Sequence, residues 1–194
     1  MPIDIKTLAY HAVNRIKYGK DKSELSEKFI SRIVSKKDFV MDIGTNTGLM
    51  TKIICKYAGF VYGFDPNPDI KISAPNLIFF NCALGAFNGE TSFYRNWKYS
   101  KSATTKIQNE TKVKQRTIDS MLLSPSILFI DAEDSEFNIL LGATETIKGV
   151  KKVLFEVHGE KSRLDCEEVL LFRGFLLKEK IIDNANSKWE YWAM

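Results

Sequence analysis

The sequence of 194 residues lacks long apolar runs, because no stretch approaches the roughly 18–20 apolar residues that a membrane-spanning helix needs. Residues 1–20 carry charges throughout and contain no apolar secretory segment, so no signal peptide is expected. The three cysteines, Cys55, Cys82 and Cys166, are scattered and without metal-binding spacing. These absences favour a cytoplasmic protein with reduced thiols and no membrane partner.

The chain also lacks a strong charge imbalance. Its 28 basic and 24 acidic residues give a formal net charge of +4, which does not by itself indicate a nucleic-acid partner. Hydrophobic residues make up 44% of the chain, enough for a full core. The length fits a single domain over residues 1–194, and no internal repeat divides it.

Short apolar runs, several of them followed by amphipathic segments, predict an α/β fold. The runs expected to form the strands of the main sheet are 39–43, 59–64, 77–80, 126–130, 152–158, 175–182 and 189–192. The last two have no helix between them, so they can only form an antiparallel hairpin. We therefore predict a doubly wound, mostly parallel, Rossmann-like sheet with an antiparallel C-terminal edge hairpin. A short extra strand is expected at 91–94, and a helix at 166–172.

Two amphipathic segments, 5–16 and 25–34, precede the first strand. They predict that residues 1–37 form a helical cover and residues 38–194 the α/β core. A helical lid over a ligand is the less favoured alternative for this cover.

A glycine loop follows the first strand, with the pattern Asp42-x-Gly44-x-Asn46-x-Gly48. Its glycines allow a tight turn and a close approach to a ligand, and the next helix begins at the loop. The pattern is not the dinucleotide fingerprint, since Asn46 stands where the middle glycine would be. An ordinary tight turn without a ligand is the alternative interpretation.

The second strand ends at Asp65, 17 residues after Gly48 (65 − 48). An acid at this point can accept hydrogen bonds from ribose hydroxyls. Acids on both sides of the loop suit a cationic nucleoside without phosphates, so S-adenosylmethionine (SAM) is favoured over NAD. After the third strand, the small residues of 81–85 suit a flat adenine base, although a plain strand end fits them equally well.

Residues 95–111 are polar and basic, with Trp97 and Tyr99 among the cations. A segment of this length without periodicity exceeds the usual ~12–15 residues of an idle loop. We interpret it as a flap that favours an anionic small or sugar-like acceptor. A solvated loop is the plain alternative, and single-stranded nucleic acid could also stack there.

Acids gather at the carboxyl ends of the last two parallel strands. Asp131 ends one of them, and Glu133 follows in a run of acids that a helix dipole also favours. Glu156 interrupts the apolar run of the next strand, and His158 closes it. A buried carboxylate is costly unless paired, so Glu156 is either functional or a salt-bridged core acid.

In order along the chain, these motifs resemble the FkbM family of SAM-dependent methyltransferases. The matching segments are 40–48, 63–68, 81–85, 117–119, 130–136, 140–143 and 155–158. The resemblance implies a class I methyltransferase fold and an O-methyltransferase that acts on small molecules or sugars. The chain departs from the family pattern at Phe129, where a lysine is usual, and at Asp134, where a glycine is usual. Its 65–81 span also leaves room for only a truncated helix.

The resemblance implies a cofactor site and an adjoining catalytic group. The expected SAM-binding residues are Asp42, Gly44, Thr45, Asn46, Gly48, Asp65, Pro66, Asn81, Cys82, Ala83 and Asp131. Either His158 or Asp131 is expected to accept the proton, with Glu133 and Glu156 as orienting residues. No metal is expected in this reading, and a divalent cation held by Asp131, Glu133 and His158 is its alternative.

The expected acceptor is a small molecule or a carbohydrate, and a nucleic acid is disfavoured. Two rival functions stay open at this point: a SAM-binding partner subunit without turnover, and a nucleic-acid methyltransferase that uses the basic 95–111 segment. The sequence does not indicate the oligomeric state.

Overall fold

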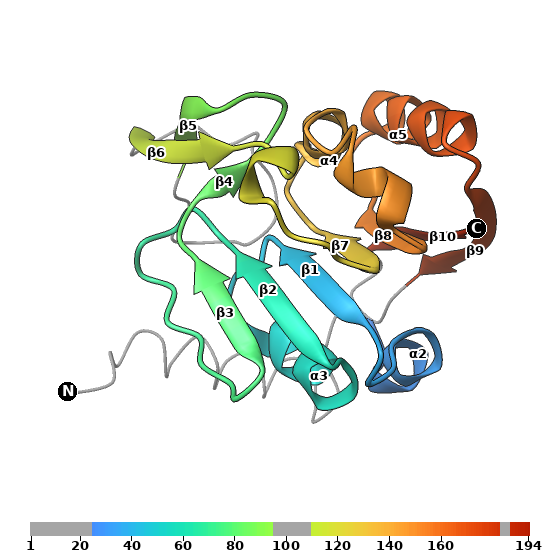
Figure 1. Cartoon of the computed structure of the whole chain (residues 1–194). Coiled ribbons are helices and arrows are strands. Elements are labelled where there is room, and N and C mark those ends of the chain that lie inside the picture. Colours follow the sequence, from blue (N-terminus) through green and yellow to red (C-terminus); the bar gives the residue numbers. More distant parts are fainter. Residues whose placement is uncertain (1–24, 95–109, 183–186) are drawn as a thin grey trace.

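The computed structural model describes residues 25–94, 110–182 and 187–194 (Figure 1). A seven-stranded sheet has the order β3-β2-β1-β7-β8-β10-β9. Its strands are β1 Phe39–Ile43, β2 Phe60–Phe64, β3 Leu77–Phe80, β7 Ile127–Ile130, β8 Lys152–Glu156, β9 Leu176–Ile182 and β10 Lys188–Ala193. The first five pair in parallel, and β10 runs antiparallel to both β8 and β9. The predicted sheet and its C-terminal hairpin are therefore confirmed.

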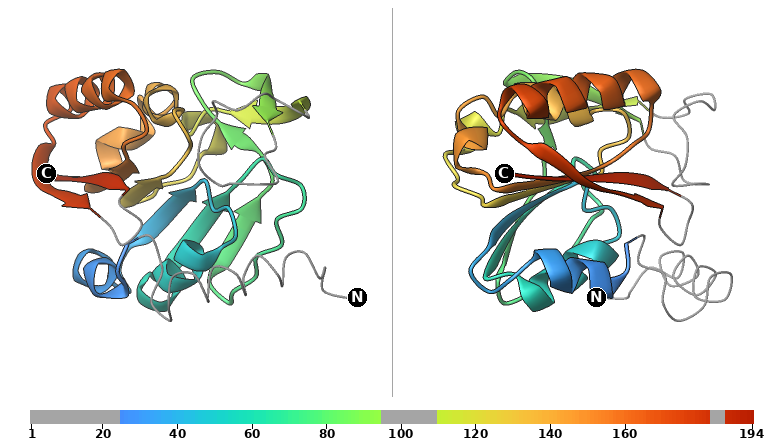
Figure 2. Two further views of the ribbon diagram at one scale, coloured as in Figure 1. Left: turned by 180° about the vertical axis from the view of Figure 1, so that it is seen from behind. Right: turned by 90° about the vertical axis from the view of Figure 1, so that its right-hand side faces the viewer.

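Helices cover both faces of this sheet, as the doubly wound prediction requires (Figures 1 and 2). One face carries α2 (Glu27–Ile33) and α3 (Leu49–Tyr57), and the other carries α4 (Glu136–Leu141) and α5 (Glu160–Phe172). Val40 packs into the core on the α2 side, whereas Met41 and Ile43 pack on the α4 side. Burial on both faces explains why the strands read as continuous apolar runs.

The helix predicted at 25–34 is confirmed as α2. Its N-cap is Ser26, whose hydroxyl accepts a hydrogen bond from the amide of Phe29 at 3.2 Å. Phe29, Ile30 and Ile33 form its buried stripe, and each contributes roughly 1.5–3 kcal/mol by leaving water. The helix expected at 5–16 lies outside the described residues, and the assignment of 1–194 to a single domain stays a prediction.

A second, three-stranded sheet has the order β4-β6-β5. It consists of β4 (Ala83–Leu84), β5 (Gly89–Tyr94) and β6 (Glu110–Arg116). The sequence predicted the strand at 91–94, which is β5, but not β6, because β6 is polar and mostly exposed and therefore lacks an apolar signal. The predicted flap is corrected at its end, since residues 110 and 111 belong to β6; residues 95–109 lie outside the described part of the chain.

Three boundaries differ from the sequence prediction. Strand β8 ends at Glu156, so His158 lies in the loop two residues beyond it. Helix α5 begins at Glu160 rather than at Cys166, since its first turns are held by ion pairs of Arg163 rather than by apolar periodicity. The 65–76 connection, which is wholly described, contains no helix at all. None of the described helices is long and apolar enough to cross a bilayer.

Candidate active site at the carboxyl edge of the sheet

The carboxyl ends of β2, β1 and β7 lie side by side, because backbone hydrogen bonds continue past the strands. The amide of Gly44 donates to the carbonyl of Phe64 at 2.9 Å, and the amide of Asp131 donates to that of Ile43 at 2.8 Å. Asp42 and Asp65, at the ends of β1 and β2, are both buried. The three acids predicted at strand ends therefore lie along one edge of the sheet.

The glycine loop makes its closest approach at Gly44. This residue has φ +88°, and a Cβ atom there would lie 1.7 Å from the carbonyl oxygen of Asp131. Gly48 has φ +77° at the start of α3, and a Cβ there would meet the side chain of Ile72 at 2.8 Å. Both positions therefore require glycine, one beside the end of β7 and the other beneath the 65–76 loop.

Asp65 ties this loop to the end of β2. One of its carboxylate oxygens accepts the amide of Asn46 and the other accepts the amide of Asn67, both at 2.8 Å. Burial raises the pKa of Asp65, and the two hydrogen bonds only partly oppose this effect. Each oxygen keeps a second lone pair, so a ribose hydroxyl could still donate to the carboxylate.

Thr45 presents a buried hydroxyl in the same loop. The residue is 4% exposed, and its Oγ1 atom has no hydrogen-bond partner among the described residues. Leaving such a group unpaired costs about 1–3 kcal/mol. An unpaired hydroxyl in a glycine loop is consistent with a site that a polar ligand completes.

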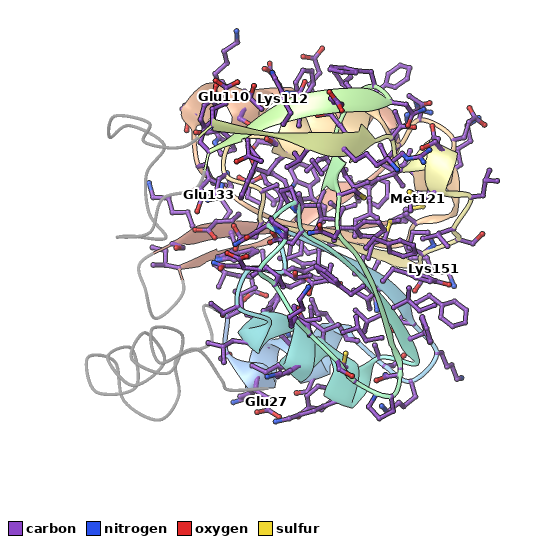
Figure 3. All side chains as sticks on the ribbon, turned by 90° about the vertical axis from the view of Figure 1, so that its left-hand side faces the viewer. Glu27, Glu110, Lys112, Met121, Glu133 and Lys151 are labelled. Atoms are coloured by element: carbon purple, nitrogen blue, oxygen red, sulfur yellow. The ribbon has the colours of Figure 1, made fainter. Side chains whose placement is uncertain are left out.

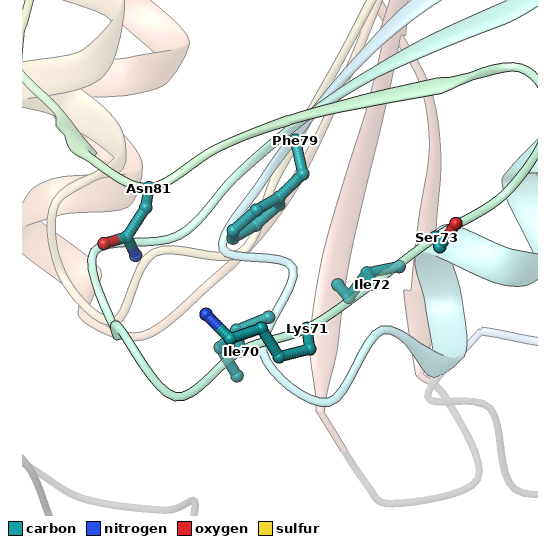
Figure 4. Close-up of a pocket in the computed structure, with 6 residues that line it drawn as sticks. All are labelled: Ile70, Lys71, Ile72, Ser73, Phe79 and Asn81. Carbon is teal, nitrogen blue, oxygen red and sulfur yellow. The ribbon is translucent and has the colours of Figure 1, made fainter. Parts of the chain in front are cut away.

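A pocket of about 310 Å³ lies beside the glycine loop, between the 65–76 loop and the end of β3 (Figure 4). It is lined by Ile70, Lys71, Ile72, Ser73, Phe79 and Asn81. The side-chain amide of Asn81 donates to the carbonyls of Asp65 and Asn67 at 2.9 Å each, which holds this wall in place. The apolar residues Ile70, Ile72 and Phe79 were missed, because nothing in their spacing marks them as neighbours.

The other residues predicted near adenine do not line this pocket. Ala83 belongs to β4 and pairs with Gln115 of β6. Cys82 is buried, which raises the pKa of its thiol, and it lines a second pocket of about 460 Å³ with Lys114 and Arg116. Pro66 is half-buried in the loop after β2.

An acid–histidine cluster (Asp131, Glu133, Glu136, Glu156 and His158) occupies the next part of the edge. Figure 3 shows Glu133 on the side of the molecule opposite to Lys151, which directly precedes β8. The Nδ1 atom of His158 lies 2.9 Å from Oε1 of Glu136. Its Nε2 atom lies 3.3 Å from Glu133, 3.7 Å from Asp131 and 3.8 Å from Glu156. The four residues predicted as catalytic are therefore brought together around one imidazole.

The electrostatics of the cluster are dominated by its carboxylates. Burial favours a neutral imidazole, but the hydrogen bond to Glu136 and the nearby carboxylate charges outweigh burial and raise the pKa of His158 to about 9. Partial desolvation also raises the pKa of Glu133, although its side chain is 52% exposed, and the positive charge of His158 opposes this. In the protein alone, the imidazole therefore carries a proton at neutral pH.

Glu136 is the member of the cluster that the sequence did not single out. It had been counted among the acids favoured by a helix dipole, yet it is 1% exposed. The available signal was its spacing from Ile139 and Leu140, which puts it on the buried stripe of α4. Its Oε1 atom also accepts the amide of Ala132 at 3.2 Å, so it connects His158 to the loop after β7.

The two departures from the FkbM pattern are accommodated within the fold. Asp134 has φ +72°, a conformation that glycine adopts without strain and that aspartate tolerates better than most residues. Phe129 is 1% exposed and packs against Trp189, with ring centroids 5.3 Å apart, on the α2 side of the sheet.

Comparison with known proteins connects this geometry to a family. The family model for the methyltransferase FkbM domain matches residues 42–180. A hexuronic acid methyltransferase, AglP, from Haloferax volcanii is 26% identical over 148 residues, which cover 69% of this chain and 61% of that protein. The chain thus spans about three fifths of the length of this curated relative.

Solved methyltransferases share the fold at low sequence identity. Ribosomal protein L11 methylase from Lactobacillus delbrueckii subsp. bulgaricus superposes with a TM-score of 0.54 and 10% identity, over 84% of this chain and 73% of that one. Precorrin-6y C5,15-methyltransferase from Geobacter metallireducens GS-15 superposes with a TM-score of 0.53 and 10% identity, over 93% of this chain and 95% of that one. These likenesses establish the class I methyltransferase fold alone. Because the family model matches well over half of its residues, the chain belongs to the FkbM methyltransferase domain family.

Proposed function

We propose that this chain transfers a methyl group from SAM to an oxygen of a small molecule or a sugar. The observation that carries the proposal is the contact between the glycine loop and the end of β7, where Gly44 meets the backbone of Asp131. This contact puts a loop suited to a cofactor next to a cluster suited to proton transfer. A methyl donor and its acceptor need such adjoining sites.

We expect the cofactor to bind along the edge of the sheet in a single orientation. Its amino-acid end would contact the 42–48 segment, including Asp42, Gly44, Thr45, Asn46 and Gly48. Its ribose would bind Asp65 beside Pro66, and its adenine would enter the pocket near Asn81, with Cys82 and Ala83 behind it. The unpaired hydroxyl of Thr45 and the apolar wall of that pocket support this orientation.

The protein has to align the acceptor with the methyl group and remove one proton from the acceptor. SAM supplies an electrophilic methyl group on a positively charged sulfur. A bond forms between the acceptor oxygen and the methyl carbon while the methyl–sulfur bond breaks, and sulfur keeps the electron pair. The hydroxyl proton passes to Asp131, or to His158 in its neutral form, and Glu133 and Glu156 hold these groups in position.

A hydroxyl acceptor suits the cluster better than a carboxylate acceptor. The four carboxylates of the cluster would repel the negative charge of a carboxylate acceptor, whereas a neutral hydroxyl can donate a hydrogen bond to them. The relative from Haloferax volcanii is a hexuronic acid methyltransferase, which supports a sugar-like acceptor. A hexuronic acid carries both kinds of oxygen, so its methylation site is the informative measurement.

Two measurements test the proposal in sequence. Calorimetric titration with S-adenosylhomocysteine should give saturable binding, and its absence would contradict the cofactor assignment. The full chain is then incubated with SAM and either glucuronic acid, a neutral hexose or a small alcohol, while release of S-adenosylhomocysteine is followed. When the acceptor is a sugar, we expect the methyl group to be transferred to one of its hydroxyl groups.

The same measurements discriminate the rival functions. Saturable binding of S-adenosylhomocysteine without turnover on any acceptor would indicate a non-catalytic SAM-binding subunit. Salt-sensitive binding of RNA or DNA would indicate a nucleic-acid methyltransferase that uses the 95–111 segment. The non-catalytic rival is not favoured, since Phe129 and Asp134 are accommodated within the fold.

A further inference from the structure

We propose that Asp131, Glu156 and His158 bind a divalent cation of the Mn²⁺ or Mg²⁺ type, with Glu136 as the residue that positions His158. The site adjoins the proposed methyl-transfer centre and deepens that proposal, but its binding test does not depend on methyl transfer. The sequence alone had favoured a metal-free site, with Asp131, Glu133 and His158 as the alternative set of ligands. The structure replaces Glu133 in that set by Glu156.

The distances within the cluster resemble those between ligands of one ion. One ligand atom from each of Asp131, Glu156 and His158 lies within 4.8 Å of the other two. The Nε2 atom of His158 is 3.7 Å from Asp131 and 3.8 Å from Glu156, too far for hydrogen bonds. Around an ion with bonds of ~2.1 Å, neighbouring ligand atoms lie ~3.0–3.4 Å apart. The two distances from Nε2 exceed this spacing by less than about 1 Å.

A separate observation concerns the other side of the imidazole. Glu136 is 99% buried (100 − 1), and its Oε1 atom lies 2.9 Å from Nδ1 of His158. This interaction fixes the ring so that Nε2 faces the carboxylates of Asp131 and Glu156. Metal-bound histidines commonly have such a carboxylate partner on their second nitrogen. The Oε2 atom of Glu136 is buried and has no hydrogen-bond partner among the described residues.

The charge balance supports a cation as well. Among the described residues, the ion pairs of Glu133, Glu136 and Glu156 are made with His158 alone. Glu156 is 9% exposed, and the described part of the chain donates no hydrogen bond to its carboxylate. Carboxylates held this close repel one another, and a buried charge without compensation is costly. A divalent cation would offset two of these charges at once.

The chemistry of the ligands selects the class of metal. Two carboxylate oxygens and one imidazole suit a hard or borderline divalent ion, and water or an acceptor oxygen can fill the remaining positions. Among the described residues, no cysteine joins the group formed by Asp131, Glu156 and His158, so no thiolate is available to select a soft ion. Mn²⁺ is therefore the probe, since it mimics Mg²⁺ and is visible by electron paramagnetic resonance.

The test is a titration of the EDTA-treated full chain with Mn²⁺ in the absence of SAM. We expect one saturable site per chain, and binding weakened at least ~10-fold by Asp131→Asn or by the isosteric Glu156→Gln. Glu136→Gln should weaken binding ~10–100-fold, although Glu136 touches no metal. The matched control is Asp134→Asn, which removes an exposed acid of the same loop and keeps its backbone conformation accessible.

Two outcomes would overturn the inference: no saturable Mn²⁺ binding, or unchanged affinity in folded Asp131→Asn and Glu156→Gln variants. Circular dichroism and unfolding midpoints identify variants that fail to fold. A parallel titration with S-adenosylhomocysteine in EDTA separates the two proposals. Cofactor binding without Mn²⁺ binding rejects only the cation site, whereas Mn²⁺ binding without cofactor binding rejects only the methyltransferase assignment.

Discussion

Oε1 of Glu136, in the first turn of α4, lies 2.9 Å from Nδ1 of His158, in the loop after β8. The same oxygen accepts the amide of Ala132 at 3.2 Å. One buried carboxylate therefore connects the loops that follow β7 and β8. These two loops hold Asp131, Glu133 and His158, so the geometry of the cluster depends on a residue outside the predicted site.

Replacing Glu136 by glutamine should lower the pKa of His158. The imidazole would keep an acceptor for its N–H but would lose the nearest negative charge, which helps raise its pKa to about 9. Proton NMR titration in EDTA is suited to this measurement, because the chain has only two histidines and His11→Gln assigns the other signal. An unchanged pKa of about 9 for His158 in the Glu136→Gln variant would contradict this prediction, because the remaining carboxylates would then be enough to raise the pKa.

Stability should fall as the pH rises from neutral to about 9. Because the folded-state pKa of His158 is raised from 6.5 to about 9, the protonated imidazole contributes fully below pH 6.5, and its contribution is lost as pH rises through 9. The shift corresponds to at most about 3 kcal/mol. Urea unfolding at pH 6 and pH 9.5 measures this contribution, as the difference in free energy of unfolding between the wild type and His158→Gln. A difference that does not shrink with pH would contradict the expectation.

Gly44→Ala should disrupt the edge of the sheet. A methyl group there would overlap the carbonyl oxygen of Asp131 at 1.7 Å, and φ +88° is unfavourable for alanine. We expect a loss of about 2–4 kcal/mol in the free energy of unfolding. Binding of S-adenosylhomocysteine should weaken as well, even where the variant still folds.

Gly149→Ala is the matched control for this substitution. Gly149 is exposed, and a Cβ there meets nothing within 4 Å. Its stability should stay within about 0.5 kcal/mol of the wild type. If both variants lost stability equally, the close approach at Gly44 would not be the cause.

Asp65→Asn should weaken binding of S-adenosylhomocysteine by ~10–100-fold. The substituted amide would direct an NH₂ group at the backbone N–H of either Asn46 or Asn67, which Asp65 now accepts at 2.8 Å each. An unsatisfied group of this kind costs about 1–3 kcal/mol. Calorimetry measures the loss, and Asp69→Asn, an exposed change in the same loop, should leave the affinity unaltered.

Local patterns in the sequence were enough to predict the main sheet. The apolar runs predicted the strands, and the lack of a helical pattern in the sequence between 182 and 189 required the antiparallel hairpin. The glycines at 44 and 48 marked a turn that only glycine can make. These features depend on residues close together in the chain, so spacing alone reports them. The polar strand β6 was not predicted, because an exposed strand needs no pattern of apolar residues.

The composition of the site was decided by tertiary structure. Whether Glu136 faces solvent or His158 depends on how α4 packs against the loop after β8, and the two residues are 22 positions apart. The same holds for Ile72, which meets Gly48 because the connection from β2 to β3 forms no helix and folds back over the glycine loop. The sequence alone determined which apolar strands form the main sheet. The order of the strands and the packing of their loops decided which side chains meet, because those contacts join residues that no local pattern relates.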